Sequence, residues 1–244
     1  MSTVCHQSVG RIISGLALAV LLLALVGCQG MPREGGPAAR EFRWRDLAKS
    51  DIDLVAEVTL RQHRTYLREL ADKLYRRNPA QLRRGVGDRE EALRQILGRP
   101  GRGLLAQWHE RRGARLVELA LSTGFEGDRV AAFVYGLRSM AVAAYGSEDE
   151  FFLSDEYDPQ KIYHLARNLE IAAWRLRAAR DASGRALLLS VGIDAGGEVN
   201  ASYERLFGKL IALHDHFAQV VADSTHRRIK NVIQGVASAV FFPL

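Results

Sequence analysis

The segment that decides the fold is residues 128–145, DRVAAFVYGLRSMAVAAY. Asp128 is a helix-capping residue, and the positions after it are apolar around nearly the whole circumference of a helix, as in a helix buried on every side. We therefore expect residues 129–145 to form the central helix of the protein. Insertion into a membrane is the weaker alternative, because Arg138 lies in the middle and the segment is shorter than the roughly 20 residues of a membrane span.

Three further helices are expected before this segment, over residues 51–77, 89–97 and 104–123. In each range the apolar residues recur at helical spacing, so that one face of the helix can be buried. Capping or helix-breaking residues bound the ranges: Ser50, Asn78, Pro79, Asp88, Gly98, Pro100 and Gly124. The sequence therefore predicts one long helix followed by two shorter ones.

Three helices are also expected after the central segment. Asp158-Pro159 is a typical helix start, with a capping residue before a proline at the first helical position. A helix capped by Asn200 or Ser202 is predicted to run to about Val221, and the last is predicted from Ile229 to Val240.

The fold class expected from these patterns is mainly α, an irregular multi-helix bundle. Only residues 186–193, followed by the turn-forming residues 194–197, have an extended pattern, which is compatible with one short β-hairpin near residues 185–199. No regular alternation of strand and helix occurs, which argues against a parallel sheet.

The C-terminal stretch, residues 232–244, is apolar and would promote association with other molecules if it were exposed. As a helix it would be about 20 Å long, too short to span a membrane. We therefore expect it to be buried against the apolar stripe of the preceding helix, which contains Leu210, Phe217 and Val221.

The N-terminus has the features of an export signal. A short polar region ends at Arg11, and residues 12–26 are apolar except for Ser14 and Gly15. A helix of about 15 residues rises about 22 Å, less than the roughly 30 Å hydrocarbon core of a bilayer. A signal peptide is therefore favoured over a permanent transmembrane anchor.

This apolar run ends in Leu25-Val26-Gly27-Cys28, which resembles the lipobox of bacterial lipoproteins at all four positions. The resemblance implies that residues 1–27 are a lipoprotein signal peptide and that Cys28 becomes the lipidated first residue, anchored by acyl chains such as palmitate. It further implies an outer-membrane protein facing the periplasm, because Gln29 stands where lipoproteins retained in the inner membrane typically carry Asp.

The chain after Cys28 divides into two parts. Residues 28–42 are rich in glycine and proline without an apolar period, which predicts a flexible tether. Residues 43–244 are long enough to form a single helical domain that is stable without disulfides. They contain no cysteine, so Cys28 has no partner for an intrachain disulfide in the processed protein.

Charge is distributed unevenly along the domain. Residues 61–115 contain fifteen basic and six acidic side chains, whereas residues 147–158 contain six acidic and no basic ones. A basic face of this kind can meet an anionic glycan or lipid, or an acidic protein. The arginines chosen as a candidate patch are Arg76, Arg77, Arg83, Arg84, Arg111 and Arg112. The alternative is a pair of solvated helix faces, partly neutralised by the acidic segment.

Metal-binding and catalytic patterns are weak. His214 and His216 project about 200° apart on a helix and cannot easily share an ion, so His214 is expected to be a hydrogen-bonded core histidine. The stretch from His109 to Gly113 lacks the second histidine of a zinc-protease helix. Glu170 and Glu204 could pair only if adjacent helices brought them together. We expect no metal site, no cofactor and no catalytic residues.

The function we expect is a helical interaction or scaffolding module that is held at the membrane by Cys28 and faces the periplasm, where an envelope protein is one possible partner. The alternatives are a periplasmic enzyme built on scattered residues and a binder of anionic envelope polymer or lipid. Nucleic acid is not an expected partner, because the sequence contains no recognisable binding module for it.

Overall fold

The computed structural model describes residues 51–146, 157–190, 201–225, 229 and 240–244. By its internal contacts the chain divides into two units, Met1–Ala48 and Lys49–Leu244, and all described residues belong to the second. The predicted signal peptide, Cys28 and the tether lie outside the described residues.

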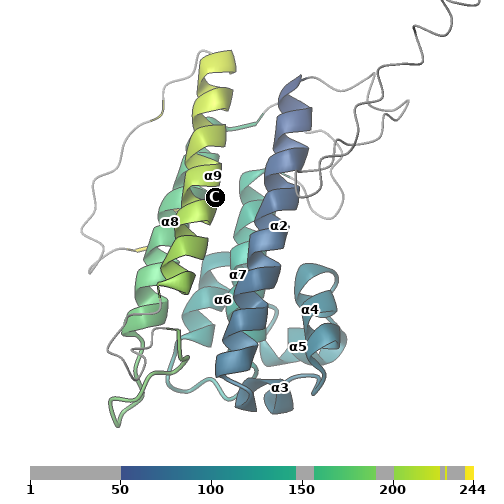
Figure 1. Cartoon of the computed structure of the whole chain (residues 1–244), viewed down its shortest axis with the longest axis vertical. Coiled ribbons are helices and arrows are strands. Elements are labelled where there is room, and N and C mark those ends of the chain that lie inside the picture. Colours follow the sequence, from purple (N-terminus) through teal and green to yellow (C-terminus); the bar gives the residue numbers. More distant parts are fainter. Residues whose placement is uncertain (1–50, 147–156, 191–200, 226–228, 230–239) are drawn as a thin grey trace, which may run out of the picture. The chain divides into compact units, whose positions relative to one another are not determined.

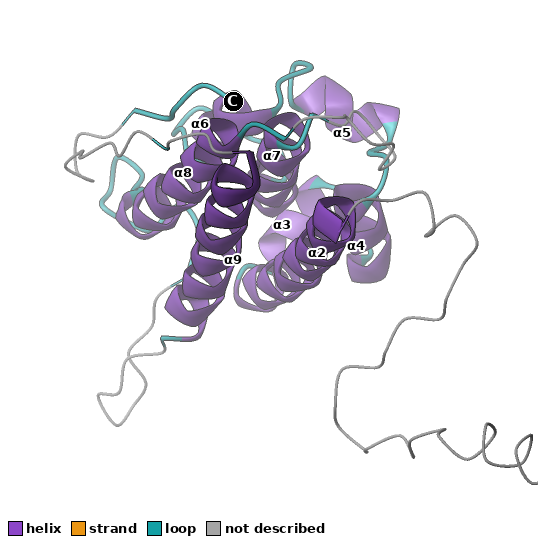
Figure 2. Ribbon diagram, turned by 90° about the horizontal axis from the view of Figure 1, so that it is seen from above, coloured by secondary structure: helices purple, strands orange, loops and turns teal. Residues whose placement is uncertain are grey.

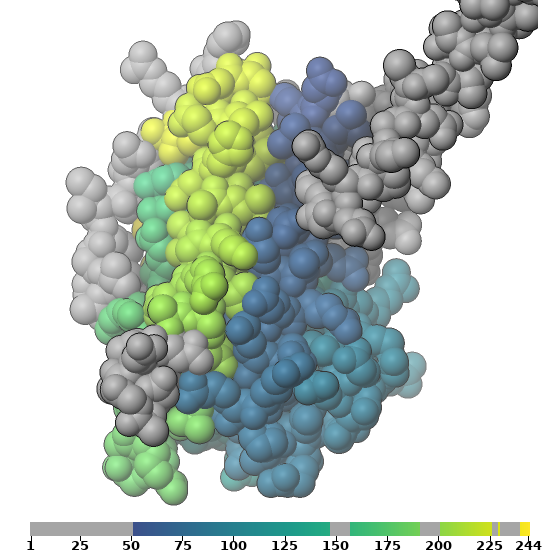
Figure 3. Space-filling model, in the orientation of Figure 1, coloured from purple at the N-terminus to yellow at the C-terminus, as the bar shows by residue number. Residues whose placement is uncertain are grey.

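The described residues form a helical bundle, which confirms the expected fold class. Its helices are α2 (Asp51–Arg77), α3 (Ala80–Arg84), α4 (Arg89–Leu97), α5 (Arg102–Gln107), α6 (Gly113–Ala120), α7 (Arg129–Ala144), α8 (Pro159–Ala178) and α9 (Ser202–Thr225). The long helices α2 and α9 lie side by side (Figures 1 and 3), and α4 lies beside α2 (Figure 2). The short helices α3, α4 and α5 follow α2 in the chain.

Helix α7 is the central helix, as the sequence predicts. It packs against α2, α4, α6 and α8, and its apolar residues from Val130 to Leu137 are almost completely buried. Its N-terminus is fixed by Asp128, whose carboxylate accepts a hydrogen bond from the backbone N–H of Ala131 at 3.0 Å. A helix with small residues on all sides can be surrounded in this way, because its neighbours approach closely.

The predicted ends of three other helices are also confirmed. Helix α2 ends at Arg77, directly before Asn78-Pro79. Asp88 caps α4 by accepting from the backbone N–H of Glu91 at 2.7 Å, and Asp158 caps α8 by accepting from Gln160 at 2.9 Å. These ends are local features of the sequence, which is why they can be recognised without the fold.

The expected helix over residues 104–123 is wrong, because the structure divides it into α5 and α6. The chain breaks after the fully buried Trp108: His109 has φ 49°, Glu110 has φ 56° and Gly113 has φ 55°. Such positive φ values end an α-helix, and they let α6 restart in a different direction, packed on α7.

The hairpin expected near residues 185–199 is reduced, in the described residues, to one antiparallel bridge between Arg180 and Ala186. The intervening turn is held by Asp181, which accepts hydrogen bonds from the backbone of Ser183 and Arg185. The pairing therefore involves residues earlier than predicted, and residues 191–200 lie outside the described part.

The expected last helix, Ile229 to Val240, lies almost entirely outside the described residues, and Ile229 and residues 240–244 are not helical. The hydrogen bonds and ring contacts that the structure shows for residues 240–244 lie on α8. Phe241 and Leu244 also pack against the buried core, to which Leu210, Phe217 and Val221 belong. These three residues of α9 are already buried: α9 packs against α2 and α8, and Phe217 stacks on Tyr145 with ring centroids 5.4 Å apart.

No helix in the described ranges is both long enough and apolar enough to cross a membrane.

Candidate functional site

A pocket of about 710 Å³ lies where α6 begins, beside α7 and the segment 240–244. Its lining residues come from three stretches that are distant in sequence: Arg112, Gly113, Ala114 and Arg115; Tyr135, Arg138, Ser139, Met140, Val142, Ala143 and Gly146; Phe242, Pro243 and Leu244. A volume of this size is within the usual range for small-molecule sites. The pocket is therefore the candidate functional site of the described residues.

Helices α6 and α7, which both contribute lining residues, approach each other closely next to the pocket. A Cβ atom added at Gly136 would lie 2.7 Å from Cγ2 of Val117 and 3.1 Å from the carbonyl oxygen of Gly113, so only glycine fits between the two helices. Ser139 ties the start of α6 to α7, because its Oγ accepts from the backbone N–H of Gly113 at 2.8 Å.

Three guanidinium groups give the pocket its charge. Arg112 and Arg115 are exposed residues at the start of α6, and Arg138 is a half-buried residue of α7. The guanidinium of Arg138 lies 5.5 Å from the centroid of the Tyr135 ring, which is a cation–π geometry. Tyr135 is in turn stacked on the buried Trp108, at 4.8 Å between ring centroids. None of the described lining residues is acidic, so the pocket is electropositive.

The segment 240–244 forms one wall of the pocket and is held there by Asn168 of α8. The side-chain amide of Asn168 donates to the carbonyl oxygen of Phe242 at 3.0 Å, and its Oδ1 accepts from the backbone N–H of Phe242 at 2.7 Å. Asn168 is fully buried. This paired contact satisfies both backbone groups of Phe242, much as a neighbouring β-strand would.

Two further α8 residues hold the same wall. The ring of His164 stacks on Phe242 with centroids 4.9 Å apart, and its Nδ1 lies 3.0 Å from the carbonyl oxygen of Pro243. The guanidinium of Arg175 lies 4.7 Å from the centroid of the Phe241 ring. The wall is therefore a built part of the fold, fixed by hydrogen bonds and ring contacts.

The six arginines of the predicted patch lie in different surroundings. Arg76 pairs with Asp72 at 2.8 Å, and Arg84 lies close enough to Asp128 to influence the pKa of its carboxyl. Arg112 lines the pocket, with two arginines that the patch did not include, Arg115 and Arg138. The sequence therefore identified one of the three arginines that line the pocket, Arg112. The other two could not be identified, because it is the packing of α6 on α7 that brings the three together.

A second polar feature lies in the core, where the prediction of a hydrogen-bonded core histidine at position 214 is confirmed. His214 and His63 are both almost fully buried, and Nδ1 of His63 lies 2.8 Å from Nε2 of His214. Nδ1 of His214 lies 2.9 Å from the hydroxyl of Tyr145. Nε2 of His63 is buried with no hydrogen-bond partner among the described residues.

Burial keeps both imidazoles uncharged. Desolvation, together with the positive charge of Arg138, lowers the pKa of His63 from 6.5 to about 3. Desolvation and the neighbouring His63 lower the pKa of His214 well below its usual value. Burial also raises the pKa of the Tyr145 hydroxyl. The three groups therefore form a neutral hydrogen-bonded row between α2, α9 and the end of α7.

The structure does not bring the candidate carboxylates together. Glu170 pairs with Arg167 at 3.0 Å, whereas Glu204 pairs with Arg177 at 3.3 Å. His109 and His216 are exposed. In the described part of the chain, no group of three or more potential ligands could hold a metal ion.

Comparisons of the chain with protein-family models, with curated proteins and with solved structures give no match.

Proposed function

We propose that this chain is a lipid-anchored binding module of the bacterial cell envelope. In this proposal acyl chains on Cys28 hold the protein at the periplasmic face of the outer membrane, and the helical bundle binds an anionic partner in the arginine-lined pocket. The pocket is the observation that carries the binding role, since three guanidinium groups and no described acidic residue line it.

The N-terminal motif supports the anchoring part of the proposal. Leu25-Val26-Gly27-Cys28 follows a signal-like apolar run, and Cys28 is the last of the two cysteines in the sequence. Two or three acyl chains bind a membrane far more firmly than one, because each buried methylene contributes about 0.8 kcal/mol. Such an anchor requires no transmembrane helix in the bundle.

A Cys28→Ala variant tests the anchor. We expect it to accumulate as unprocessed precursor without incorporating labelled palmitate, whereas the unchanged chain is labelled and fractionates with the outer membrane. Normal cleavage of Cys28→Ala, or a mature N-terminus at another residue by mass spectrometry, would contradict the proposal.

Crosslinking in intact cells, followed by purification of the full chain, tests the binding role. A reproducible anionic glycan, lipid or acidic protein is the expected product, and its recovery should fall when Arg112 and Arg115 are replaced by glutamine. Recovery that is unchanged in this double variant would remove the pocket from the proposal. Turnover in a broad hydrolase screen of the full chain would instead favour the enzyme alternative.

A further inference from the structure

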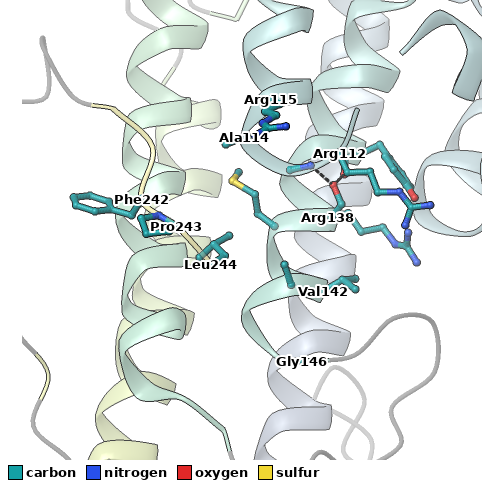
Figure 4. A pocket seen from close by; sticks show the side chains of 14 residues that line it. Arg112, Ala114, Arg115, Arg138, Val142, Gly146, Phe242, Pro243 and Leu244 are labelled. Atoms are coloured by element: carbon teal, nitrogen blue, oxygen red, sulfur yellow. Dashed lines mark hydrogen bonds between the residues drawn. The ribbon is translucent and has the colours of Figure 1, made fainter. Parts of the chain in front are cut away.

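The walls of the pocket differ in chemistry. In Figure 4, Arg112 and Arg138 lie together on one side, whereas Pro243 and Leu244 lie on the opposite side. The Phe242 ring points away from the arginines and stacks on His164. The pocket therefore has a cationic side and an apolar side, which face each other across the same space.

A ligand that matches only one side would leave the other unsatisfied. An inorganic anion can pair with the guanidinium groups but leaves the apolar wall in contact with water. An uncharged alkane covers the wall but removes water from the arginines without replacing their hydrogen bonds. A ligand with an anionic head and one apolar chain satisfies both sides.

We propose that the pocket binds a single-chain amphipathic anion, a carboxylate or phosphate monoester carrying one alkyl chain. The head group pairs with Arg112 and Arg115 at the start of α6, and the chain lies between Val142 of α7 and Leu244 of the wall. This inference rests on the proposed binding role of the same pocket and adds the chemical class of the ligand.

The local backbone favours the same head-group position. Helix α6 begins at Gly113 without a side-chain cap, and the residues of its first turn line the pocket. The partial positive charge of a helix N-terminus adds to the charge of the arginines around it. Arg112 and Arg115 form no ion pair with a carboxylate of the described residues, so their donors remain available to a ligand.

The apolar side of the pocket exists only when the segment 240–244 is held in place by the fold. Leu244 is half-buried and packs against the core, while Asn168 fixes the backbone of Phe242 beside it. Replacing Asn168 by alanine should therefore weaken binding of the chain but leave binding of a head group alone unchanged. The arginine variants therefore test binding of the head group, and the Asn168 variant tests binding of the alkyl chain.

Photolabelling of the full chain in phosphatidylcholine nanodiscs tests the inference. The probe is decyl phosphate with a diazirine at the end of its chain, and the labelled peptides are identified by mass spectrometry. We expect label on the tryptic peptide that begins at Ser139 and on the peptide that contains residues 240–244. Unlabelled decyl phosphate should compete, while inorganic phosphate and decanol should compete at least tenfold more weakly.

Decanoate in place of decyl phosphate distinguishes the two head groups, and a double-chain anionic lipid in the nanodisc tests a bilayer source. Competition by the bilayer lipid alone would overturn the single-chain class. Shortening the competitor by one methylene should weaken it about fourfold if the chain is buried. A competitor whose affinity does not depend on chain length would also overturn the inference.

Arg112→Gln and Arg102→Gln form a matched pair. Both residues are exposed and both changes remove one positive charge, but Arg102 does not line the pocket. We expect Arg112→Gln to weaken competition by decyl phosphate about tenfold, and Arg102→Gln to change it less than twofold. Equal losses, or label confined to other peptides, would overturn the inference, while the processing of Cys28 tests the anchor separately.

Discussion

His63 and His214 are 151 residues apart in sequence, yet Nδ1 of the first lies 2.8 Å from Nε2 of the second in the core between α2 and α9. Their rings meet at 60°, with centroids 4.9 Å apart. One nitrogen must donate and the other accept, so the tautomer of one imidazole determines that of the other. The hydroxyl of Tyr145 extends this row at the other nitrogen of His214.

Replacing His214 should destabilise the fold more than replacing His63. His214→Leu leaves two buried groups without a partner, Nδ1 of His63 and the hydroxyl of Tyr145, at a cost of about 2–4 kcal/mol in the free energy of unfolding. His63→Leu leaves only Nε2 of His214 unpaired and removes a nitrogen that already lacks a partner, so we expect about 1 kcal/mol. Urea denaturation of the full chain measures both values.

The double variant His63→Leu, His214→Leu completes a thermodynamic cycle. Because the two residues share one hydrogen bond, the double variant should lose about 1–2 kcal/mol less than the sum of the single losses. Additive losses would mean that the two imidazoles do not interact in solution.

The stability contributed by the same pair should decrease as the pH falls below 6.5. The pKa of His63 is about 3 in the folded protein and 6.5 in an unfolded chain, so between these values the unfolded chain binds more protons. Each such histidine costs about 1.4 kcal/mol per pH unit in this window. The double leucine variant should lose this dependence, measured as the difference between its unfolding free energy and that of the unchanged chain from pH 7 to pH 4.

The two proteins must be compared, because Asp128 changes the stability with pH in the opposite direction. Burial raises the pKa of its carboxyl from 3.8 to about 6, so it contributes stability below pH 3.8 that is lost as the pH rises through 6. Asp128 is present in both proteins and cancels in the comparison. Parallel pH profiles for the two proteins would contradict the assignment of the histidines as buried and neutral.

The helices could be predicted from sequence because their signals are local. Asp128, Asp88 and Asp158 each precede a helix that they cap, and apolar spacing identifies the buried faces. The burial of His214 followed from its place on such a face. The break after Trp108 was missed, because the positive φ values of His109 and Glu110 result from tertiary packing and not from a preference of those residues.

The pocket could be predicted only in part. Arg112 belonged to the candidate patch, but Arg138 was seen only as an argument against a membrane helix. The wall depends on Asn168, a polar residue of α8 that accepts and donates at Phe242, 74 residues later in the chain. No periodicity marks such a pair, because a side-chain contact with a distant backbone leaves no local pattern.

Two helix glycines provide a test of the α6–α7 contact. In Gly208→Ala on α9, the added Cβ has no atom within 4 Å apart from its chain neighbours and the backbone of its own helix. This variant should therefore stabilise the protein by about 0.5–1 kcal/mol, the usual gain in helix propensity from glycine to alanine in a helix interior. Gly136→Ala places its Cβ 2.7 Å from Val117 and should destabilise by about 1–3 kcal/mol despite the same gain in helix propensity. Thermal unfolding of both variants is sufficient, and a Gly136→Ala protein as stable as Gly208→Ala would contradict the close contact.

The carboxyl of Asp128 has two roles that substitutions can separate. Oδ1 caps α7, while Oδ2 accepts from the hydroxyl of Tyr75 at 2.8 Å. Asp128→Asn retains an acceptor for the cap, and we expect it to cost at least 1 kcal/mol less than Asp128→Ala, which leaves Tyr75 and the helix end unpaired. Equal unfolding free energies for the two variants would show that the cap does not contribute.

The wall of the pocket depends on Asn168, and graded substitutions there test it. Asn168→Ala removes both hydrogen bonds to Phe242 and should cost about 1–3 kcal/mol in the free energy of unfolding. Asn168→Asp retains an acceptor for the N–H of Phe242 but turns a carboxylate toward its carbonyl oxygen. It should therefore release the wall as well, most completely above the pKa of the new carboxyl.

Hydrogen exchange at the backbone N–H of Phe242 measures release of the wall directly. In the unchanged chain this N–H is bonded to a buried acceptor, so its exchange should be slow. We expect exchange to accelerate at least tenfold in Asn168→Ala. Exchange at Leu165 and Leu169, on the buried face of the same helix, should stay slow and serves as the control. If Phe242 remains equally protected, the wall is held by the His164 and Arg175 contacts instead, and the chain-binding half of the pocket no longer depends on Asn168.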